Sequence, residues 1–366
     1  MSDHWRATPG GKLRARGIGI PFDGTPGPLN AITDVDGVEV GYCTLVQGEG
    51  ALVRGVGPIR TGVTAIVPRG REDALTPVFA GYHSLNGNGE LTGSHWIAES
   101  GQFEGPITIT NTHSCGVARD ATIRWMVDRA ASGMTGWGLP VAAETYDGNL
   151  NDINGFHVRE AHVLEAIDAA RGGPIEQGSV GGGTGMICYD FKGGSGTASR
   201  RVAAGGTTWT VGVFVQSNFG IRRELVIAGV PVGKSLPGGE VRSKPAGSVI
   251  AVVATDAPLL PHQLARLARR VGLGLARTGA VAHNGSGDIF LAFSTANRAA
   301  WDTGDSPRAA TFLANDTMDP LFAAVIEATE EAVVDSMVAN QPMTGRDGVH
   351  VRALPHEALA ALLSGR

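Results

Sequence analysis

The stretch "SKPAGSVIAVVATDAP" at residues 243–258 decides the fold of this 366-residue chain. From Ser248 to Thr255 small and apolar residues follow one another without a break, which predicts a buried β-strand. The loop before it is polar and contains Pro245 and Gly247, which favour a turn. A strand of the core therefore begins on a residue with a hydroxyl side chain, directly after a turn.

The rest of the chain predicts further strands and several amphipathic helices. Val, Ile, Thr and Phe are enriched in segments flanked by Gly or Pro, and other segments repeat apolar residues at three and four positions. The expected strands are 63–68, 106–111, 207–216, 248–255 and 288–295, and the expected helices are 116–131, 157–171, 261–279 and 320–340. Because the helices come in blocks and not in strict alternation with the strands, stacked α and β layers are favoured over a regular βαβ winding.

Composition and charge exclude several classes of function. The net charge is −5 with no run of Lys or Arg, so no nucleic-acid or membrane partner is expected. No window is apolar enough to span a membrane and the N-terminus lacks the apolar core of a signal peptide, so a cytoplasmic location is expected. Three scattered cysteines predict no disulfide framework.

Neither a metal nor another cofactor is expected. The histidines show no spacing typical of a metal site, and structural roles suit them better. The glycine run "GGGTG" (181–185) does not fit a dinucleotide fingerprint, and the residues after it favour a strand and not a phosphate-binding helix.

Ser248 could be a nucleophile. A Ser hydroxyl needs a base, and the α-amino group of the same residue can serve if the chain is cut before it. The Gly247–Ser248 bond suits such a cut, because Gly247 has no Cβ to hinder attack of the hydroxyl on the preceding carbonyl. Taken alone, Ser after Gly at a strand start is more often a plain turn residue.

Two further sets of polar residues are candidates for the same site. In "AHNGSGDIFLAFST" (282–295) Ser286 and Asp288 are two positions apart, so both face the same side of an extended segment and resemble the orienting part of a catalytic triad. In "ETYDGNLNDIN" (144–154) and "VQSNFG" (215–220), Tyr146 and Asn218 could donate to an oxyanion and Glu144 could hold a substrate ammonium group. Ordinary turn chemistry would explain each segment as well.

The combination of segments resembles one known family. The segments "GNGELTG" (87–93), "ETYDGNLNDINGFHV" (144–158), "GGGTGMICYDFKGGSGTASR" (181–200), "VQSNFG" (215–220), "PAGSVIAVVATDAPLLPHQL" (245–264) and "AHNGSGDIFLAFSTAN" (282–297) are similar, in this order, to L-aminopeptidase D-amidase/D-esterases and β-peptidyl aminopeptidases. The resemblance covers almost the whole chain. It implies an α+β protein with a four-layer αββα sandwich, similar in architecture to the N-terminal nucleophile hydrolases but with different strand connectivity.

The resemblance also implies a precursor of one domain, 1–366, that cuts itself between Gly247 and Ser248 into chains 1–247 and 248–366. By matching motif, Ser248 is then the nucleophile, with Ser286 and Asp288 as its supporting triad, Tyr146 and Asn218 around the oxyanion and Glu144 on the substrate amine. The implied substrates are short peptides, amino-acid amides or esters, and the implied assembly is a tetramer of αβ units. One position departs from the pattern: Asp288 stands where the β-peptide-cleaving members carry Glu, so the preferences for α- or β-amino and for L- or D-residues stay open.

Two other functions remain alternatives at the level of sequence. A self-cleaving acyltransferase of the glutamate N-acetyltransferase type would use similar chemistry, although those proteins use Thr where this chain has Ser248. An inactive scaffold could keep the same fold, but it would have no need for five polar groups around one cleft. Dependence of the products on an added amine would identify the first, and a chain that stays whole would identify the second.

Overall fold

The computed structural model describes residues 3–130, 137–242, 247–301 and 306–364, and it contains two stacked β-sheets. One sheet has the strand order β1-β2-β5-β6 and the other the order β4-β3-β12-β11-β10-β9. In the larger sheet β11 lies parallel to β12 and antiparallel to β10. The strand that begins at the predicted cut is therefore an inner strand with a neighbour on each side.

The strands and helices have the following bounds. The strands of the two large sheets are β1 (Glu39–Gln47), β2 (Ile59–Val67), β3 (Val78–Gly87), β4 (Gln102–Phe103), β5 (Ile107–Asn111), β6 (Val141–Thr145), β9 (Gly194–Ala204), β10 (Thr207–Asn218), β11 (Gly247–Thr255) and β12 (Ser286–Ser294). Two short hairpins add β7 (Ile187–Cys188), β8 (Phe191–Lys192), β13 (Met343–Thr344) and β14 (His350–Val351). The α-helices are α1 (Ser94–Ser100), α2 (Cys115–Arg129), α3 (Glu160–Asp168), α4 (Val232–Ser235), α5 (Pro261–Arg277), α6 (Asp319–Val338) and α7 (His356–Ser364).

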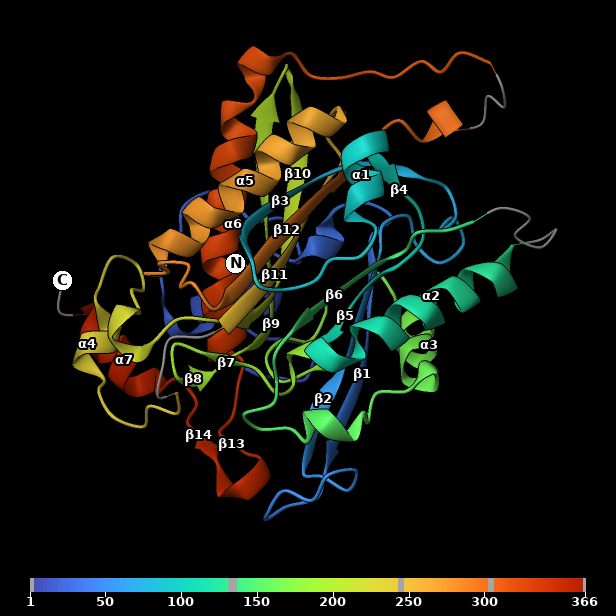
Figure 1. Ribbon diagram of the computed structural model, residues 1–366. Helices are drawn as coiled ribbons and strands as arrows, with labels where there is room; N and C mark the ends of the chain where they lie inside the picture. The colour runs from blue at the N-terminus through green and yellow to red at the C-terminus, as the bar shows by residue number, and fades with distance from the viewer. Residues whose placement is uncertain (1–2, 131–136, 243–246, 302–305, 365–366) are drawn as a thin grey trace.

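Helices cover the outer face of each sheet, so the fold has four layers in the order αββα (Figure 1). Helices α5 and α6 pack on the six-stranded sheet, and α2 and α3 pack on the four-stranded sheet. Alternate residues of β11 enter different layers: Val249 and Val253 contact the helix side, whereas Ile250 and Val252 face the other sheet. This alternation follows from the two-residue period of a strand and confirms the layered fold expected from the sequence.

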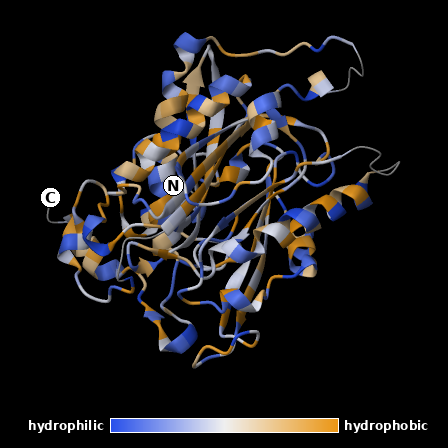
Figure 2. Ribbon diagram, in the orientation of Figure 1, coloured by the Kyte–Doolittle hydropathy of each residue, from blue (hydrophilic) through white to orange (hydrophobic). Residues whose placement is uncertain are grey.

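Apolar residues gather along the central strands, while the outer helices carry both polar and apolar residues (Figure 2). Helix α5 shows why its sequence forms a helix. Pro261 occupies its first turn, where the missing N–H costs nothing, Leu264 and Leu267 lie on its buried face, and Gly279 follows its end with φ +93°. No helix in the described part of the chain is long and apolar enough to cross a membrane.

Candidate active site

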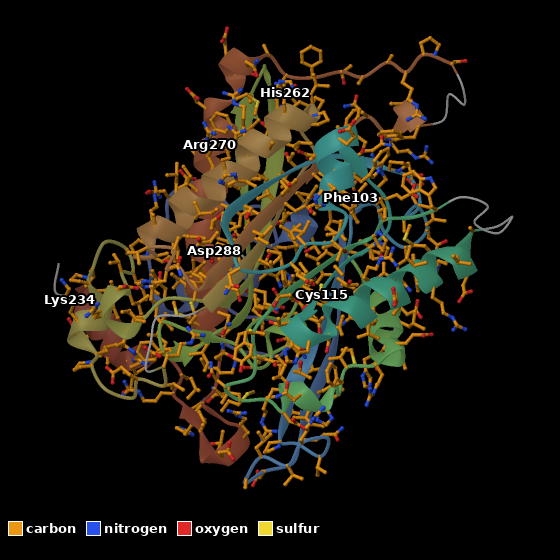
Figure 3. All side chains as sticks on the ribbon, in the orientation of Figure 1. Phe103, Cys115, Lys234, His262, Arg270 and Asp288 are labelled. Carbon is orange, nitrogen blue, oxygen red and sulfur yellow. The ribbon has the colours of Figure 1, made fainter. Side chains whose placement is uncertain are left out.

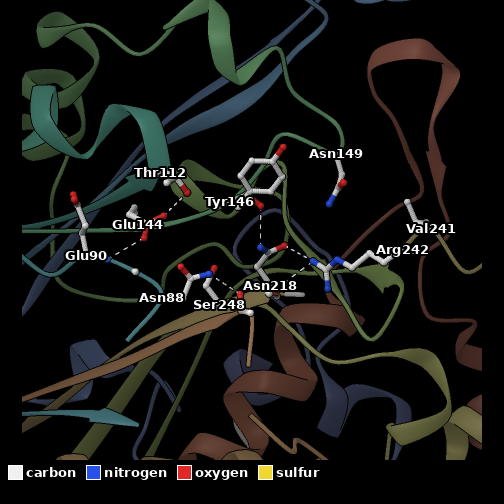
Figure 4. Close-up of a pocket in the computed structure, with 13 residues that line it drawn as sticks. Asn88, Glu90, Thr112, Glu144, Tyr146, Asn149, Asn218, Val241, Arg242 and Ser248 are labelled. Atoms are coloured by element: carbon white, nitrogen blue, oxygen red, sulfur yellow. Dashed lines mark hydrogen bonds between the residues drawn. The ribbon is translucent and has the colours of Figure 1, made fainter. Parts of the chain in front are cut away.

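Strands from both sheets end around one cavity of about 700 Å³ (Figure 4). Ser248 and Asn218 reach it from β11 and β10 of the six-stranded sheet, and Glu144 reaches it from β6 of the four-stranded sheet. Tyr146 follows β6 and also lines the cavity. The structure thus brings together four side chains from three separate segments of the chain, all of which the sequence singled out.

Ser248 lies at the base of this cavity as the second residue of β11. Its register partner on β10 is Asn218, so the two side chains are on the same face of the sheet and adjacent to each other. Ser248 is only 4% exposed, and its Oγ has no hydrogen-bond partner among the described residues. A buried hydroxyl without a partner costs free energy, and this one faces the cavity, where a bound molecule could supply the missing partner.

The side-chain amide of Asn218 is held in one orientation. Its Oδ1 accepts hydrogen bonds from the backbone N–H of Ile187 at 3.0 Å and from Nη2 of Arg242 at 2.8 Å. Its Nδ2 donates to the backbone oxygen of Tyr146 at 2.9 Å. The second Nδ2 hydrogen makes no further bond with the described residues, so it can serve an oxygen atom in the cavity.

Glu144 lies on the opposite side of the cavity and is almost completely buried. The backbone N–H of Glu90 donates to its Oε1 at 3.0 Å, and the hydroxyl of Thr112 donates to its Oε2. Burial raises the pKa of this carboxyl group, and the Thr112 and Glu90 hydrogen bonds partly offset the effect. A buried carboxylate held in this way is suited to bind an ammonium group.

Tyr146 is the most exposed of the predicted site residues, at 44%. Its backbone oxygen accepts a hydrogen bond from Nδ2 of Asn218, and the residue lines the cavity (Figure 4). The side chain therefore borders the entrance, where it can contact a bound molecule.

Ser286 and Asp288 form a pair, but the pair lies on the other face of the sheet. Ser286 Oγ donates to Oδ1 of Asp288 at 2.7 Å. In the parallel register Ser286 is beside Gly247 and Asp288 beside Val249, so both point to the helix side, where they border a small cavity under α5. Figure 3 shows Asp288 near the centre of the molecule. Burial raises the pKa of Asp288 above its ordinary value.

This placement changes the triad that the sequence suggests. Because side chains alternate along β11, the Ser286–Asp288 pair is not hydrogen-bonded to Ser248 Oγ. Ser286 instead pairs with Gly247, the residue before Ser248, in the parallel register.

Gly247 fits its position only because it has no side chain. A Cβ built there would lie 2.5 Å from the backbone oxygen of Asn218 and 2.6 Å from Cα of Phe219. Contacts this short require β10 or β11 to move. The remainder of the predicted scissile loop, residues 243–246, is outside the described residues.

Sequence reasoning missed Arg242, Thr112 and Asn149, which also line the cavity. Asn149 lies in the quoted segment 144–154 but was not singled out there, Thr112 belongs to no quoted segment, and Arg242 stands in a polar loop that reads as a plain linker. Only the pairing of β10 with β11 reveals that this loop passes next to Asn218. In the described ranges no group of three or more His, Cys, Asp or Glu residues could hold a metal ion.

Comparison with known proteins identifies the family. Residues 30–351 match peptidase family S58. The chain belongs to this family. It is 52% identical to the β-peptidyl aminopeptidase BapA of Sphingosinicella microcystinivorans over 96% of this chain and 91% of that protein, and 47% identical to BapA of Sphingosinicella xenopeptidilytica, with the same coverage.

Solved structures of two named aminopeptidases have the same fold as this chain. The L-aminopeptidase D-Ala-esterase/amidase of Ochrobactrum anthropi, described as a prototype of the serine aminopeptidases and a variant of the Ntn hydrolase fold, is 50% identical with a TM-score of 0.91 and covers 96% of this chain and 98% of its own. The Burkholderia sp. β-aminopeptidase is 48% identical with a TM-score of 0.87, over 96% and 99%. The family and fold expected from the sequence are confirmed. This S58 chain is a hydrolase of peptide and amide bonds of the serine aminopeptidase type.

Proposed function

We propose that Ser248 is the nucleophile of this aminopeptidase and that a cut between Gly247 and Ser248 activates it, dividing the chain into 1–247 and 248–366. The observation that carries the proposal is the position of Ser248. Its buried, unpartnered Oγ lies beside the fixed amide of Asn218, in a cavity whose other side carries the buried carboxylate of Glu144. Nucleophile, oxyanion donor and amine acceptor thus share one cavity.

The cut would use the same hydroxyl. Ser248 Oγ attacks the carbonyl carbon of Gly247, the C–N bond breaks, and the acyl group moves from nitrogen to oxygen. Water then hydrolyses the ester, which leaves a carboxylate on Gly247 and a free amine on Ser248. The close fit of Gly247 against Asn218 and Phe219 supports this step, because it presses the scissile peptide against the end of β10.

The Ser286–Asp288 pair supports the amine released by the cut. Ser286 lies beside Gly247 in the register, so its hydroxyl can bond the nitrogen of Ser248, and Asp288 holds that hydroxyl at 2.7 Å. The α-amino group has an ordinary pKa of about 7.7–8.0, so its neutral form can take the proton of Ser248 Oγ near neutral pH. The Ser286–Asp288 pair therefore acts on the α-amino group of Ser248, which is the base, and not directly on Oγ of Ser248, which is the nucleophile.

Turnover follows from the same groups. Glu144 binds the ammonium group of the substrate, Ser248 Oγ attacks the adjacent carbonyl, and Asn218 Nδ2 donates to the oxyanion while Tyr146 borders the bound substrate. The amine or alcohol leaves with a proton from the α-amino group. Water then hydrolyses the acyl-enzyme on Ser248, which releases the N-terminal residue.

The substrate class is a short peptide, amino-acid amide or ester with a free amine. The cavity of about 700 Å³ has room for such a molecule. Relatives named β-peptidyl aminopeptidase and L-aminopeptidase D-Ala-esterase/amidase support both β-amino and α-amino substrates as candidates. A tetramer of αβ units in the cytoplasm completes the proposal; light scattering of the purified protein and cell fractionation test these two points.

The variant Ser248→Ala tests the proposed function, with Ser217→Ala as a matched control. Ser217 is the neighbour of Asn218 on β10, and its buried Oγ also has no partner, but it lies beside Val249 on the opposite face. We expect Ser248→Ala to remain one chain and to hydrolyse no aminoacyl amide, and Ser217→Ala to be cut and active. Processing of Ser248→Ala would remove Ser248 from this role.

A further inference from the structure

The loop that precedes the proposed cut is anchored to the active site through Arg242. One nitrogen of its guanidinium, Nη2, donates to Oδ1 of Asn218 at 2.8 Å and to the backbone oxygen of Ile187 at 2.9 Å, and it lies 3.3 Å from the backbone oxygen of Asn218. A positively charged donor that bonds an amide oxygen and the neighbouring backbone oxygens holds that amide strongly in one orientation.

A second contact fixes the backbone of the same loop. The N–H groups of Val241 and Arg242 both lie 3.3 Å from Oδ1 of Asp190, whose other carboxylate oxygen accepts from the N–H of Arg222 at 3.1 Å. Asp190 is buried in the turn of the β7–β8 hairpin, outside the loop. Arg242 is thus held from its backbone as well as from its side chain, six residues before Ser248.

We propose that Arg242 is a positioning residue for Asn218 and that it stays in place after the cut, on the new C-terminal tail of chain 1–247. The inference rests on the proposed roles of Ser248 and Asn218. With Arg242 and Ile187 on Oδ1, the Asn218 amide is unable to flip, so Nδ2 keeps its free hydrogen toward the cavity. A cation on Oδ1 also polarises the amide and makes its N–H a stronger donor to an oxyanion.

A double-mutant cycle between Arg242 and Asn218 tests the inference. The variants Arg242→Met, Arg242→Lys, Asn218→Ala and Arg242→Met/Asn218→Ala are compared on an aminoacyl amide, with rates normalised to the amount of cut chain found by mass spectrometry. We expect Arg242→Met to lower kcat by about 10-fold or more with little change in KM, and Arg242→Lys to recover part of the loss. In the Asn218→Ala background Arg242→Met should cost less than about twofold, because its target is gone.

Arg352→Met is the matched control. Arg352 also holds the pre-cut loop, through Nη2 to the backbone oxygens of Pro237 and Gly238, but no hydrogen bond joins it to Asn218 in the described structure. If loosening this loop were enough to lower kcat, Arg352→Met would do so too. We expect its kcat to stay within about twofold of the unmodified protein.

The outcomes separate this inference from the proposed function. The positioning role is overturned if Arg242→Met lowers kcat equally in the presence and in the absence of the Asn218 side chain. It is also overturned if Arg352→Met lowers kcat as much as Arg242→Met does. Both conclusions hold even if Ser248→Ala is inactive. Activity or processing in Ser248→Ala would instead defeat the proposed function. If Arg242→Met is not cut, the same cycle is run on the rate of processing, and normal processing of Asn218→Ala would then overturn the inference.

Discussion

At the scale of single residues, the amide of Asn218 is the group whose removal is most informative. Its position next to Ser248 and its fixed orientation suit it to the proposed role of side-chain donor to the oxyanion. We predict that Asn218→Ala lowers kcat by on the order of 10²-fold or more, because a donor that acts on the transition state is lost. Steady-state kinetics on an aminoacyl amide measure this, and a loss below about threefold would contradict the role.

Glu144 leads to a prediction about pH. Its carboxyl group must be ionised to bind an ammonium group, and burial raises its pKa above the ordinary value. As the pH falls through this raised pKa, KM for substrates with a free amine should rise. Glu144→Gln should raise KM roughly 10- to 100-fold at neutral pH, since a hydrogen bond to a charged group is lost, and should abolish that part of the pH profile. A Glu144→Gln profile with an unchanged acid limb would assign the titration to another group.

At the scale of elements, the contact between β10 and the first residue of β11 controls the proposed cut. A side chain at position 247 would collide with the backbone of Asn218 and Phe219. We predict that Gly247→Ala slows processing by at least 10-fold, because the scissile peptide is displaced from Ser248. Gly116→Ala in α2 is the control, since a Cβ there meets no atom within 4 Å. The fraction of cut chain after expression measures both, and normal cutting of Gly247→Ala would refute the proposed fit.

The turn after β6 contains a buried acid that affects stability. Burial raises the pKa of Asp147 to about 7. The folded chain binds the proton of Asp147 more tightly than the unfolded chain does. The contribution of this proton to the free energy of unfolding is complete below about pH 4 and is lost as the pH rises to about 7. The gap from the ordinary value of 3.8 corresponds to on the order of 4 kcal/mol.

Asp147→Asn removes that titration and can keep the bond from Asn151 to Oδ1. We compare the difference in Tm between the variant and the unmodified protein at two pH values. We expect this difference to favour the variant by several degrees more at pH 8 than at pH 5. Thermal unfolding at the two pH values measures the difference. An equal difference at both would show that Asp147 does not titrate in this range.

At the scale of the whole molecule, buried ion pairs join the two chains that the cut would produce. Arg14 contacts Asp335 at 2.7 Å, and Arg16 and Arg200 contact Glu331 at 2.7 and 2.8 Å. The three arginines lie before the cut and both acids lie after it, in α6. We predict that the cut chains elute together in gel filtration without denaturant.

Glu331→Gln should then destabilise the molecule by about 3–5 kcal/mol, because a buried carboxylate that pairs with both Arg16 and Arg200 is lost and, in the described structure, only Arg200 keeps a second acid, Glu327 at 3.5 Å. Chemical denaturation measures this effect. Chains that separate on dilution would contradict the joining role of these pairs.

Much of the architecture follows from the sequence alone, because apolar runs and helical periods report burial directly. The predicted strand at 248–255 is β11 with one added residue, and the predicted helix at 261–279 is α5. Strands β1, β3 and β9 were not predicted, since they are partly exposed or rich in Gly and lack a clear apolar pattern. These segments form strands because they pair with neighbouring strands, and their local sequence alone does not show this.

The site was predictable residue by residue but not in its geometry. Ser248, Asn218, Tyr146 and Glu144 meet as the resemblance implied, whereas the face taken by Ser286 depends on the register of β12 against β11. Register is a long-range property, and a shift by one residue would have turned Ser286 to the opposite face. The same holds for Arg242, whose partner on β10 is more than 20 residues away in sequence.

An intact-mass spectrum of the freshly purified protein tests the central claim most directly. The account predicts two species whose masses add up to the whole chain plus one water, the smaller one beginning with Ser248. A single species with the mass of the uncut chain, in a preparation that hydrolyses aminoacyl amides, would contradict it.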